Sequence, residues 1–345
     1  MSHTTLYRKY RPQNFSEVLG QDHIVDILKN ELKEGKIAHA YLFSGPRGTG
    51  KTSIARIFAA ELGCAPEDLY EIDGASNRGI DEIRTLKEGV GTLPFRGDIK
   101  IYVIDEVHML TKEAFNALLK TLEEPPEYVV FILATTELHK VPDTIISRCQ
   151  AFTFKKPTEH ILKKMVETVS KKEDANLDEE AISLISFLGD GSFRDTHTVL
   201  EQVLNISGKK KITGDDVAKI TGAPAKTLVH SFIEGILEKD SEKGLAAIGE
   251  AHEKNMDMKV YTKLILKHLR YALLLSFSQN LAPSIKEDVG EDEFRYLEKI
   301  SQHENKKIFP EAINTLIEAH NQISRSHITQ LPLELALVKL SQKEG

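Results

Sequence analysis

The sequence has little cysteine and no long apolar run. Two cysteines, Cys64 and Cys149, occur among 345 residues, and so low a count excludes a disulfide framework and a cysteine-rich zinc site. The most apolar stretch, residues 271–277, is too short to span a bilayer, and no N-terminal segment resembles a signal peptide. These absences predict a protein of the reducing cytoplasm with no membrane partner.

An excess of positive charge is also lacking. The formal net charge is −7, so the molecule as a whole has no attraction for nucleic acid, and any contact with DNA or RNA requires local basic clusters. The length of 345 residues predicts two or three domains, because single cores rarely grow beyond about 250–300 residues.

A glycine-rich stretch, GPRGTGKT at residues 45–52, matches G-x-x-x-x-G-K-[ST] at every fixed position. Its glycines let backbone N–H groups point inward and let phosphate oxygens approach the main chain. Lys51 would place a charge on the β- and γ-phosphates, and Thr52 would offer its hydroxyl to Mg²⁺. A plain turn is the alternative, but the apolar run before the loop and the helical pattern after it favour a phosphate site. The predicted nucleotide contacts here are Gly45, Pro46, Arg47, Gly48, Thr49, Gly50, Lys51, Thr52 and Ser53.

Apolar runs alternate with helical patterns in the first part of the chain. The runs cover residues 40–43, 69–72, 99–104, 129–134 and 151–154. Because these runs are continuous rather than alternating, they predict a parallel five-stranded sheet with helices on both faces, which is an α/β fold. Amphipathic patterns predict helices over residues 22–32 and after Thr111.

Strand patterns stop after Pro157. Thr158, Asp178 and Ser192 stand where N-caps of successive helices are expected, which predicts a small helical module. A turn-rich hinge near residues 221–224 begins a remainder that is helical throughout. Its most apolar helix, residues 257–277, is apolar on almost every face near its end, so it is either the core of this part or a subunit interface.

Two carboxylates, Asp105 and Glu106, end the apolar run at 99–104. At the C-terminal end of a parallel strand beside the phosphate loop, Asp105 could hold Mg²⁺ through water, and Glu106 could orient or deprotonate an attacking water. Two acids at a strand end are common on solvated surfaces, but together with the loop they predict an NTPase. Thr136 ends the next strand with a hydroxyl that could touch the γ-phosphate, plain strand termination being the alternative.

Two arginines lie at boundaries between elements. Arg148 precedes the last strand, and Arg194 opens a helix of the helical module. A guanidinium is planar, permanently charged and able to bind two phosphate oxygens, which suits an arginine finger. An ordinary surface position is the alternative for each.

Several phrases carry a resemblance to a known family. GPRGTGKT, DEVHML, NALLKTLEEPP, LATT and SRC occur in this order and are led by YRKYRPQNFSEVLGQ. With these phrases the chain resembles the bacterial DNA polymerase III gamma/tau family, the AAA+ ATPases of the replicative clamp loader, over roughly its whole length. The resemblance implies an α/β P-loop NTPase (AAA+) domain at 1–157, a helical lid domain at 158–222 and an all-α collar or oligomerisation domain at 223–345.

The resemblance also implies roles for single residues, with ATP and Mg²⁺ as cofactors. Lys51, Glu106, Thr136 (sensor 1), Arg148 (a finger reaching a neighbouring subunit's ATP) and Arg194 (sensor 2) would be catalytic. Thr52 and Asp105 would hold Mg²⁺ through water. The base and ribose would be covered by Tyr7, Arg11, Pro12 and Val18.

The implied function is that of an ATPase motor subunit that opens a sliding clamp and loads it onto primer–template DNA. The implied partners are clamp-loader subunits of the delta and delta-prime type, copies of the chain itself, the clamp and the DNA. The DNA would be held through its phosphates. Arg78, Arg84 and Lys87 are candidates for this contact, a solvated charged helix being the alternative.

The chain departs from the family pattern at two places. The family carries a four-cysteine zinc module after the P-loop helix, whereas here Cys64 keeps the first position and residues 65–69 lead straight into the next strand, so we predict no zinc. The sequence ends at Gly345, without the long extension by which the tau form binds helicase and polymerase, and the resemblance does not extend to those contacts.

Other functions remain open at this point. One is a DNA-remodelling AAA+ motor of the Holliday-junction helicase type, which shares the loop, carboxylates and helical lid. Another is a scaffold clamp-loader subunit that assembles but does not hydrolyse ATP. A third is the small subunit of replication factor C, which shares SRC but typically has Asn at the position of Thr136.

Overall fold

The computed structural model describes residues 4–77, 79–207 and 211–341. The chain divides into two compact units, one made of residues 1–162 and 189–198, the other of residues 163–188 and 199–345. Each unit is described by itself.

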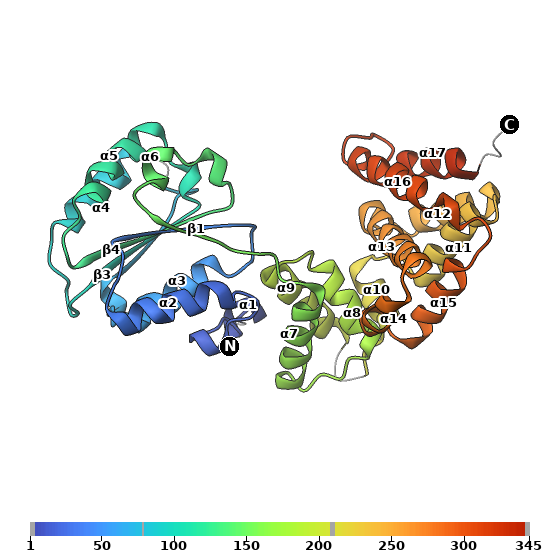
Figure 1. Cartoon of the computed structure of the whole chain (residues 1–345), viewed down its shortest axis with the longest axis horizontal. Helices are drawn as coiled ribbons and strands as arrows, with labels where there is room; N and C mark the ends of the chain where they lie inside the picture. Colours follow the sequence, from blue (N-terminus) through green and yellow to red (C-terminus); the bar gives the residue numbers. More distant parts are fainter. Residues whose placement is uncertain (1–3, 78, 208–210, 342–345) are drawn as a thin grey trace. The chain divides into compact units, whose positions relative to one another are not determined.

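The first unit contains a parallel sheet in the order β2-β3-β4-β1-β5 (Figure 1). Its strands are β1 (Ala40–Ser44), β2 (Leu69–Asp73), β3 (Lys100–Asp105), β4 (Val129–Thr135) and β5 (Gln150–Thr153). All pairings are parallel, with Ser44 in register with both Thr135 and Thr153, and Asp73 in register with Asp105. The predicted fold class and all five predicted strands are confirmed, with ends that differ by at most one or two residues.

The sheet separates two apolar cores, because successive side chains of a strand point to opposite faces. On one face Tyr41 and Phe43 pack with α2 (Asp22–Glu34) and α3 (Lys51–Glu61), and on the other Ala40 and Leu42 pack with α4 (Ile80–Val90), α5 (Lys112–Glu123) and α6 (Asp143–Ile146). In Figure 1 these two sets of helices lie on opposite sides of the strands. Strands buried on both faces explain the continuous apolar runs in the sequence.

The N-terminal arm precedes the first long helix. It contains α1 (Leu6–Lys9) and a 3-10 turn, η1 (Phe15–Glu17). Leu6 and Phe15 are buried, whereas Tyr7 and Tyr10 remain partly exposed. Leu6 and Phe15 therefore anchor the arm, which leaves the Tyr7 ring available for other contacts.

The second unit is built from helices. The helices after β5 are α7 (Glu159–Lys172), α8 (Glu179–Leu188), α9 (Phe193–Ser207), α10 (Gly214–Thr221), α11 (Lys226–Leu237), α12 (Ser241–Glu253), α13 (Met258–Phe277), α14 (Ala282–Val289), α15 (Glu291–Ser301), α16 (Phe309–Ile323) and α17 (Leu331–Ser341), of which α7 and α9 each contribute residues to both units. The predicted caps are present: Thr158 accepts from the N–H of Ile161, Asp178 from that of Ala181 and Ser192 from that of Asp195.

The most apolar helix, α13, has different surroundings at its two ends. Tyr261, Ile265 and Leu269 are fully buried in the core of the second unit, whereas Phe277 is 83% exposed. The helix is therefore core over most of its length, and its last turn presents an aromatic ring to solvent within this chain. Among the described helices, none combines the length and apolar character needed to cross a membrane.

Candidate nucleotide-binding site

The phosphate loop joins β1 to α3 and takes a conformation that requires glycine. Gly48 has φ 72°, and a Cβ atom built there would lie 2.0 Å from Ser192 Oγ. Gly45 has φ 143°, and its Cβ would lie 2.5 Å from the Phe154 carbonyl oxygen. The Phe193 N–H donates to the Gly48 carbonyl at 2.9 Å. The loop is therefore packed closely against the start of α9 and the residue after β5, with no room for a side chain at Gly45 or Gly48.

Two buried polar residues stabilise the loop from behind. Thr49 Oγ1 donates to the Pro46 carbonyl at 2.9 Å. Gln21, fully buried, donates to the Thr49 carbonyl at 3.4 Å and to the Lys155 carbonyl at 2.7 Å. The sequence reasoning missed Gln21 as a positioning residue, although it ends the leading phrase YRKYRPQNFSEVLGQ. Of the other predicted loop contacts, Pro46 and Arg47 are exposed, and Gly50 and Ser53 are half-buried.

Lys51 lies across the loop. Its ammonium donates to the carbonyls of Gly45 at 2.7 Å and Pro46 at 2.9 Å, and the residue is 6% exposed. Burial lowers the pKa of Lys51, and the carboxylates of Glu106 and Asp105 oppose this shift. The charge is thus held among backbone oxygens, where phosphate oxygens could replace them as acceptors.

Thr52 and Asp105 meet at the C-terminal edge of the sheet. Thr52 Oγ1 donates to Asp105 Oδ2 at 2.7 Å, and Asp105 Oδ1 accepts from the N–H of Glu106 at 2.9 Å. A hydroxyl and a carboxylate at one point form the hard oxygen donor set that suits Mg²⁺. These residues fit the predicted cofactor, and the helix α3 begins at the same point, with its positive end toward a bound anion.

Glu106 has a left-handed backbone, with φ 47° and ψ 44°. A non-glycine residue in this region carries strain and persists only where its surroundings fix it. Its side chain accepts a hydrogen bond from Thr136 Oγ1 at 2.9 Å. The two residues come from the ends of the neighbouring strands β3 and β4, so the structure brings together the predicted water-activating carboxylate and the predicted sensor 1 hydroxyl.

His108 adjoins this pair and was not singled out from the sequence. Its side chain is 5% exposed, and Nδ1 lies 2.9 Å from Thr135 Oγ1 and 3.4 Å from Glu106 Oε2. Nε2 lies 3.8 Å from Glu137 Oε1. The histidine is the fourth residue of the DEVH phrase, so its place in that phrase was the signal that could have identified it.

Arg194 lies beside the N-terminal arm. Its guanidinium carbon is 5.0 Å from the centre of the Tyr7 ring, a cation–π distance. Burial lowers the pKa of the nearby Arg11, which is half-buried like Pro12. Val18 packs against the core between the sheet and α2. Arg194 and Tyr7 are thus brought together, whereas Val18 is engaged in core packing as well as being a predicted base contact.

Arg148 is engaged within its own chain at a different place. One guanidinium nitrogen donates to the Thr144 carbonyl at 2.7 Å, and the other pairs with Glu123 at 2.7 Å. Its side chain remains 34% exposed. The contacts of the guanidinium are thus with Thr144 and Glu123, and the role of Arg148 toward a neighbouring subunit stays a prediction.

The predicted DNA contacts lie on or near α4. Arg78 lies outside the described residues, and so does the side chain of Arg84, whose backbone belongs to α4. Lys87 is exposed on the same helix. Its exposure is compatible with a phosphate contact and equally with an ordinary charged surface.

The two cysteines are half-buried free thiols. Burial raises the pKa of Cys64 to about 11 and that of Cys149 to about 12. A raised pKa lowers the fraction of reactive thiolate at neutral pH.

Family models match most of the chain in two parts. A family described as DNA polymerase III, delta subunit, matches residues 20–78 and 66–158. A family described as DNA polymerase III subunits gamma and tau domain III matches residues 212–344. The first match covers the sheet and the phosphate loop, and the second covers the helices from α10 onward.

Curated relatives match with consistent names. DNA polymerase III subunit tau of Bacillus subtilis is 37% identical over 99% of this chain and 64% of its own length. Subunit gamma of Buchnera aphidicola is 32% identical over 99% of both chains, and subunit tau of Escherichia coli is 39% identical over 74% of this chain and 43% of its own length. The chain thus spans about two thirds or less of the tau relatives and nearly all of the gamma relative.

Solved structures show the same fold at low identity. The Thermotoga maritima RuvB Holliday junction branch migration motor is 20% identical, with a TM-score of 0.54 over 66% of this chain and 80% of that chain. This likeness concerns the fold alone. The curated relatives at 32–41% identity are similar enough to show the family as well as the fold. The chain belongs to the DNA polymerase III gamma/tau family.

Proposed function

We propose that the chain is the ATPase motor subunit of a replicative clamp loader, which uses ATP binding and hydrolysis to open a sliding clamp and load it onto primer–template DNA. The observation that carries the proposal is the Thr52–Asp105 contact at 2.7 Å beside the Glu106–Thr136 contact at 2.9 Å. These contacts bring the pair that we propose to hold Mg²⁺ and the pair that we propose to activate water to one sheet edge, in a chain of the gamma/tau family.

Nucleotide binding would use the loop and Lys51. The triphosphate would replace the Gly45 and Pro46 carbonyls as the acceptor of the Lys51 ammonium. Thr52 and Asp105 would hold Mg²⁺, which would neutralise charge on the β- and γ-phosphates. Arg194 would meet the γ-phosphate from the start of α9, and Tyr7, Arg11, Pro12 and Val18 would cover the base and ribose.

Hydrolysis would depend on Glu106. Its carboxylate would accept a hydrogen bond from the attacking water and increase that water's nucleophilicity. Thr136 now donates to Glu106 Oε2, and the same hydroxyl could instead meet a γ-phosphate oxygen. His108, buried between Glu106 and Thr135, would fix the direction of the carboxylate as a positioning residue.

Assembly would complete the site. Arg148 would leave Glu123 and reach the γ-phosphate bound by a neighbouring copy, where a permanent charge can stabilise the transition state by a factor of about 10³–10⁵. We assign residues 1–157 to an ATPase domain, 158–222 to a lid and 223–345 to a collar that binds copies of the chain and subunits of the delta and delta-prime type. DNA would be held through its phosphates inside the assembly.

Complementation between two inactive variants tests the proposal. Lys51→Ala removes the phosphate-binding charge but keeps Arg148, and Arg148→Ala removes the finger but keeps the loop. Each variant alone, assembled with companion subunits, clamp and primed DNA, should have almost no ATPase activity. Mixed in equal amounts they should recover up to about a quarter of the wild-type rate, because head-to-tail interfaces then create seams with one intact loop and one intact finger.

Arg295→Ala is the matched control, since this arginine is exposed on α15. It should keep the wild-type rate. A mixture that assembles fully yet stays inactive would overturn the trans role of Arg148. Clamp-independent strand separation by the wild-type assembly would favour a helicase-type motor instead, and an assembly without ATP turnover would favour a scaffold subunit.

A further inference from the structure

We propose that His230, His268 and Glu293 form a binding site for a divalent transition-metal ion, with Zn²⁺ the best fit. The site lies in the helical unit and shares no residue with the nucleotide site. The inference stands independently of the proposed ATPase function.

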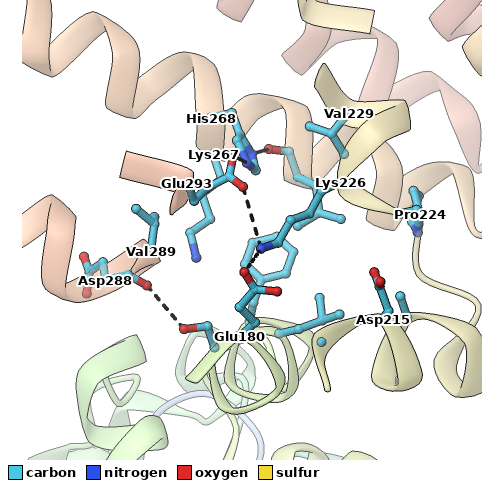
Figure 2. Close-up of a pocket in the computed structure, with 17 residues that line it drawn as sticks. Glu180, Asp215, Pro224, Lys226, Val229, Lys267, His268, Asp288, Val289 and Glu293 are labelled. Atoms are coloured by element: carbon cyan, nitrogen blue, oxygen red, sulfur yellow. Dashed lines mark hydrogen bonds and ion pairs between the residues drawn. The ribbon is translucent and has the colours of Figure 1, made fainter. Parts of the chain in front are cut away.

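The three side chains come from three helices, α11, α13 and α15. His230 Nε2 lies 2.7 Å and His268 Nε2 lies 2.9 Å from the same oxygen, Oε1 of Glu293. All three potential ligand atoms lie within 4.8 Å of one another. Figure 2 shows Glu293 and His268 side by side at one wall of a pocket. Groups that converge on one point from separate helices can surround an ion.

The hydrogen bond at Nδ1 of His268 indicates whether its Nε2 has a lone pair for a metal ion. Nδ1 lies 2.7 Å from the Leu264 carbonyl oxygen, and because that oxygen can only accept, Nδ1 carries a proton. In a neutral ring, Nε2 then has a lone pair, and it faces a carboxylate oxygen that has lone pairs as well. A cation between the two atoms turns this repulsive pair into two ligands.

The surroundings hold the ligands in the manner typical of metal sites. Metal-binding histidines usually donate their second N–H to a carbonyl, as His268 does to Leu264. The ring of His230 stacks on Tyr296 with centres 3.6 Å apart, which fixes its orientation. Lys226 Nζ lies 3.8 Å from Oε2 of Glu293, which leaves Oε1 for the ion.

The charge and access of the cluster are compatible with a divalent ion. Glu180 also pairs with Lys226 (Figure 2), so the two carboxylates outnumber this ammonium. Glu293 and His268 line a cavity of about 90 Å³, which has room for a water molecule as fourth ligand. The His230 side chain is 24% exposed and provides a route from solvent.

Two imidazole nitrogens and one carboxylate oxygen are a set that Zn²⁺ accepts with a water in the fourth position. Ligand bonds of about 2.0–2.1 Å place tetrahedral ligand atoms about 3.3 Å apart, so the present contacts would open by about half an ångström. Each ring would give its Nε2 lone pair to the ion, and any proton on that nitrogen would pass to solvent. The bound ion would join three helices of the unit.

Cobalt substitution tests the site in the full-length chain. Co²⁺ added to the metal-free protein should produce the intense visible absorption of a four-coordinate site, saturating at one equivalent, and Zn²⁺ should abolish it. His268→Gln and Glu293→Gln should lose the absorption and weaken Zn²⁺ affinity by at least about 100-fold, because loss of a ligand exceeds the effect of losing its supporting partner. His230→Gln, at the more exposed ring, provides a variant that should fold even if the buried ones do not.

Two controls separate this site from other metal contacts. His252→Gln removes an exposed histidine on α12, and Cys64→Ser/Cys149→Ser removes both thiols; each should keep the absorption. Zn²⁺ should raise the thermal midpoint of wild-type protein but not that of His230→Gln. Unchanged Co²⁺ spectra in folded His230→Gln, or no saturable spectrum in wild type, would refute the site and leave a hydrogen-bonded cluster around Glu293.

Discussion

Glu106 is the side chain on which the proposed hydrolysis depends most directly. Glu106→Gln keeps the shape of the side chain and its contact with Thr136 but removes the base. We expect the turnover number to fall by about 10²–10⁴-fold, the range for loss of a general base. Nucleotide affinity should change little, because Lys51 and the glycine loop are untouched. ATP turnover of the assembled complex and equilibrium binding of a labelled nucleotide measure the two quantities.

The neighbouring Glu137 supplies a matched carboxylate. It pairs with Lys140 and lies near His108, and Glu137→Gln should keep most of the activity. Equal losses of ATP turnover in Glu106→Gln and Glu137→Gln would show that the negative charge of the region matters rather than a single general base.

Gly48 is the loop position where a methyl group should do most harm. Gly48→Ala introduces left-handed strain and a Cβ at 2.0 Å from Ser192 Oγ. The strain alone costs about 1–2 kcal/mol, and Gly35→Ala measures it, since Gly35 has φ 67° and no atom within 4 Å of its Cβ. Gly48→Ala should lower the free energy of unfolding by more than Gly35→Ala, measured by denaturant titration at unchanged m-value. Equal losses would mean that Ser192 moves aside.

At the scale of residues, the sequence predicted candidate phosphate- and metal-binding side chains better than it predicted contacts between residues that are distant in sequence. Lys51, Thr52 and Asp105 were predicted because phosphate and metal binding impose residue types at fixed spacings. The Arg148–Glu123 pair and the His230–Glu293 contact, 63 residues apart, were not predicted, because each depends on how distant segments pack. The left-handed backbone of Glu106 also has no sequence signal, since glutamate rarely adopts it.

At the scale of elements, Asp68 connects β2 to the loop that precedes β3. Its carboxylate accepts the backbone N–H groups of Phe95 at 2.5 Å, Arg96 at 2.9 Å and Gly97 at 3.0 Å. These donors hold the pKa of Asp68 below its ordinary value of 3.8. A carboxylate with a lowered pKa stabilises the fold above its ordinary pKa, and the contribution is lost as pH falls through the lowered value.

Asp68→Asn should therefore remove part of the acid sensitivity of folding. Wild-type stability should decline as pH falls below about 4, and the variant, less stable near neutral pH, should decline less steeply. Thermal midpoints measured across this range provide the comparison, with the exposed Asp98→Asn as control. Parallel curves for wild type and Asp68→Asn would contradict the role of the carboxylate.

The elements themselves were largely predictable because each has a local cause. Thr111 accepts from the N–H of Ala114 and begins α5, and continuous apolar runs gave the strands. The sequence pattern did not decide which side chains of the N-terminal arm are buried: Leu6 and Phe15 are, whereas Tyr7 is half-buried. An aromatic residue is a strong core candidate by size, but only the tertiary packing decides which residue of an arm faces the sheet.

At the scale of the whole molecule, the nucleotide site and the His230–His268–Glu293 cluster lie in different compact units. Calorimetry should resolve two transitions with separate ligand responses. A non-hydrolysable ATP analogue with Mg²⁺, at about 100 times its Kd, should stabilise one unit by about 2.7 kcal/mol. Zn²⁺ should raise the other transition. Movement of both transitions with either ligand would mean that the units unfold together.

The Arg148–Glu123 ion pair supplies a further whole-molecule prediction. Glu123→Gln releases the guanidinium without removing it. If the pair restrains the finger, the assembled variant should reach the wild-type maximal rate at lower ATP concentration and with a Hill coefficient nearer 1. Rate measurements against ATP concentration test this, and an unchanged curve would show that the pair has no influence on the assembly.

The position of Glu123 gives such an assembly a sense of direction. Glu123 ends α5, a helix that begins a few residues beyond Glu106, so in the proposed assembly a single helix would link one nucleotide pocket to the arginine that we propose for the next. Nucleotide binding in each protomer would then affect the arginine that it offers to one neighbour, and its own pocket would depend on the nucleotide bound by the other neighbour. ATP hydrolysis would then proceed from one protomer to the next around the assembly rather than in random order.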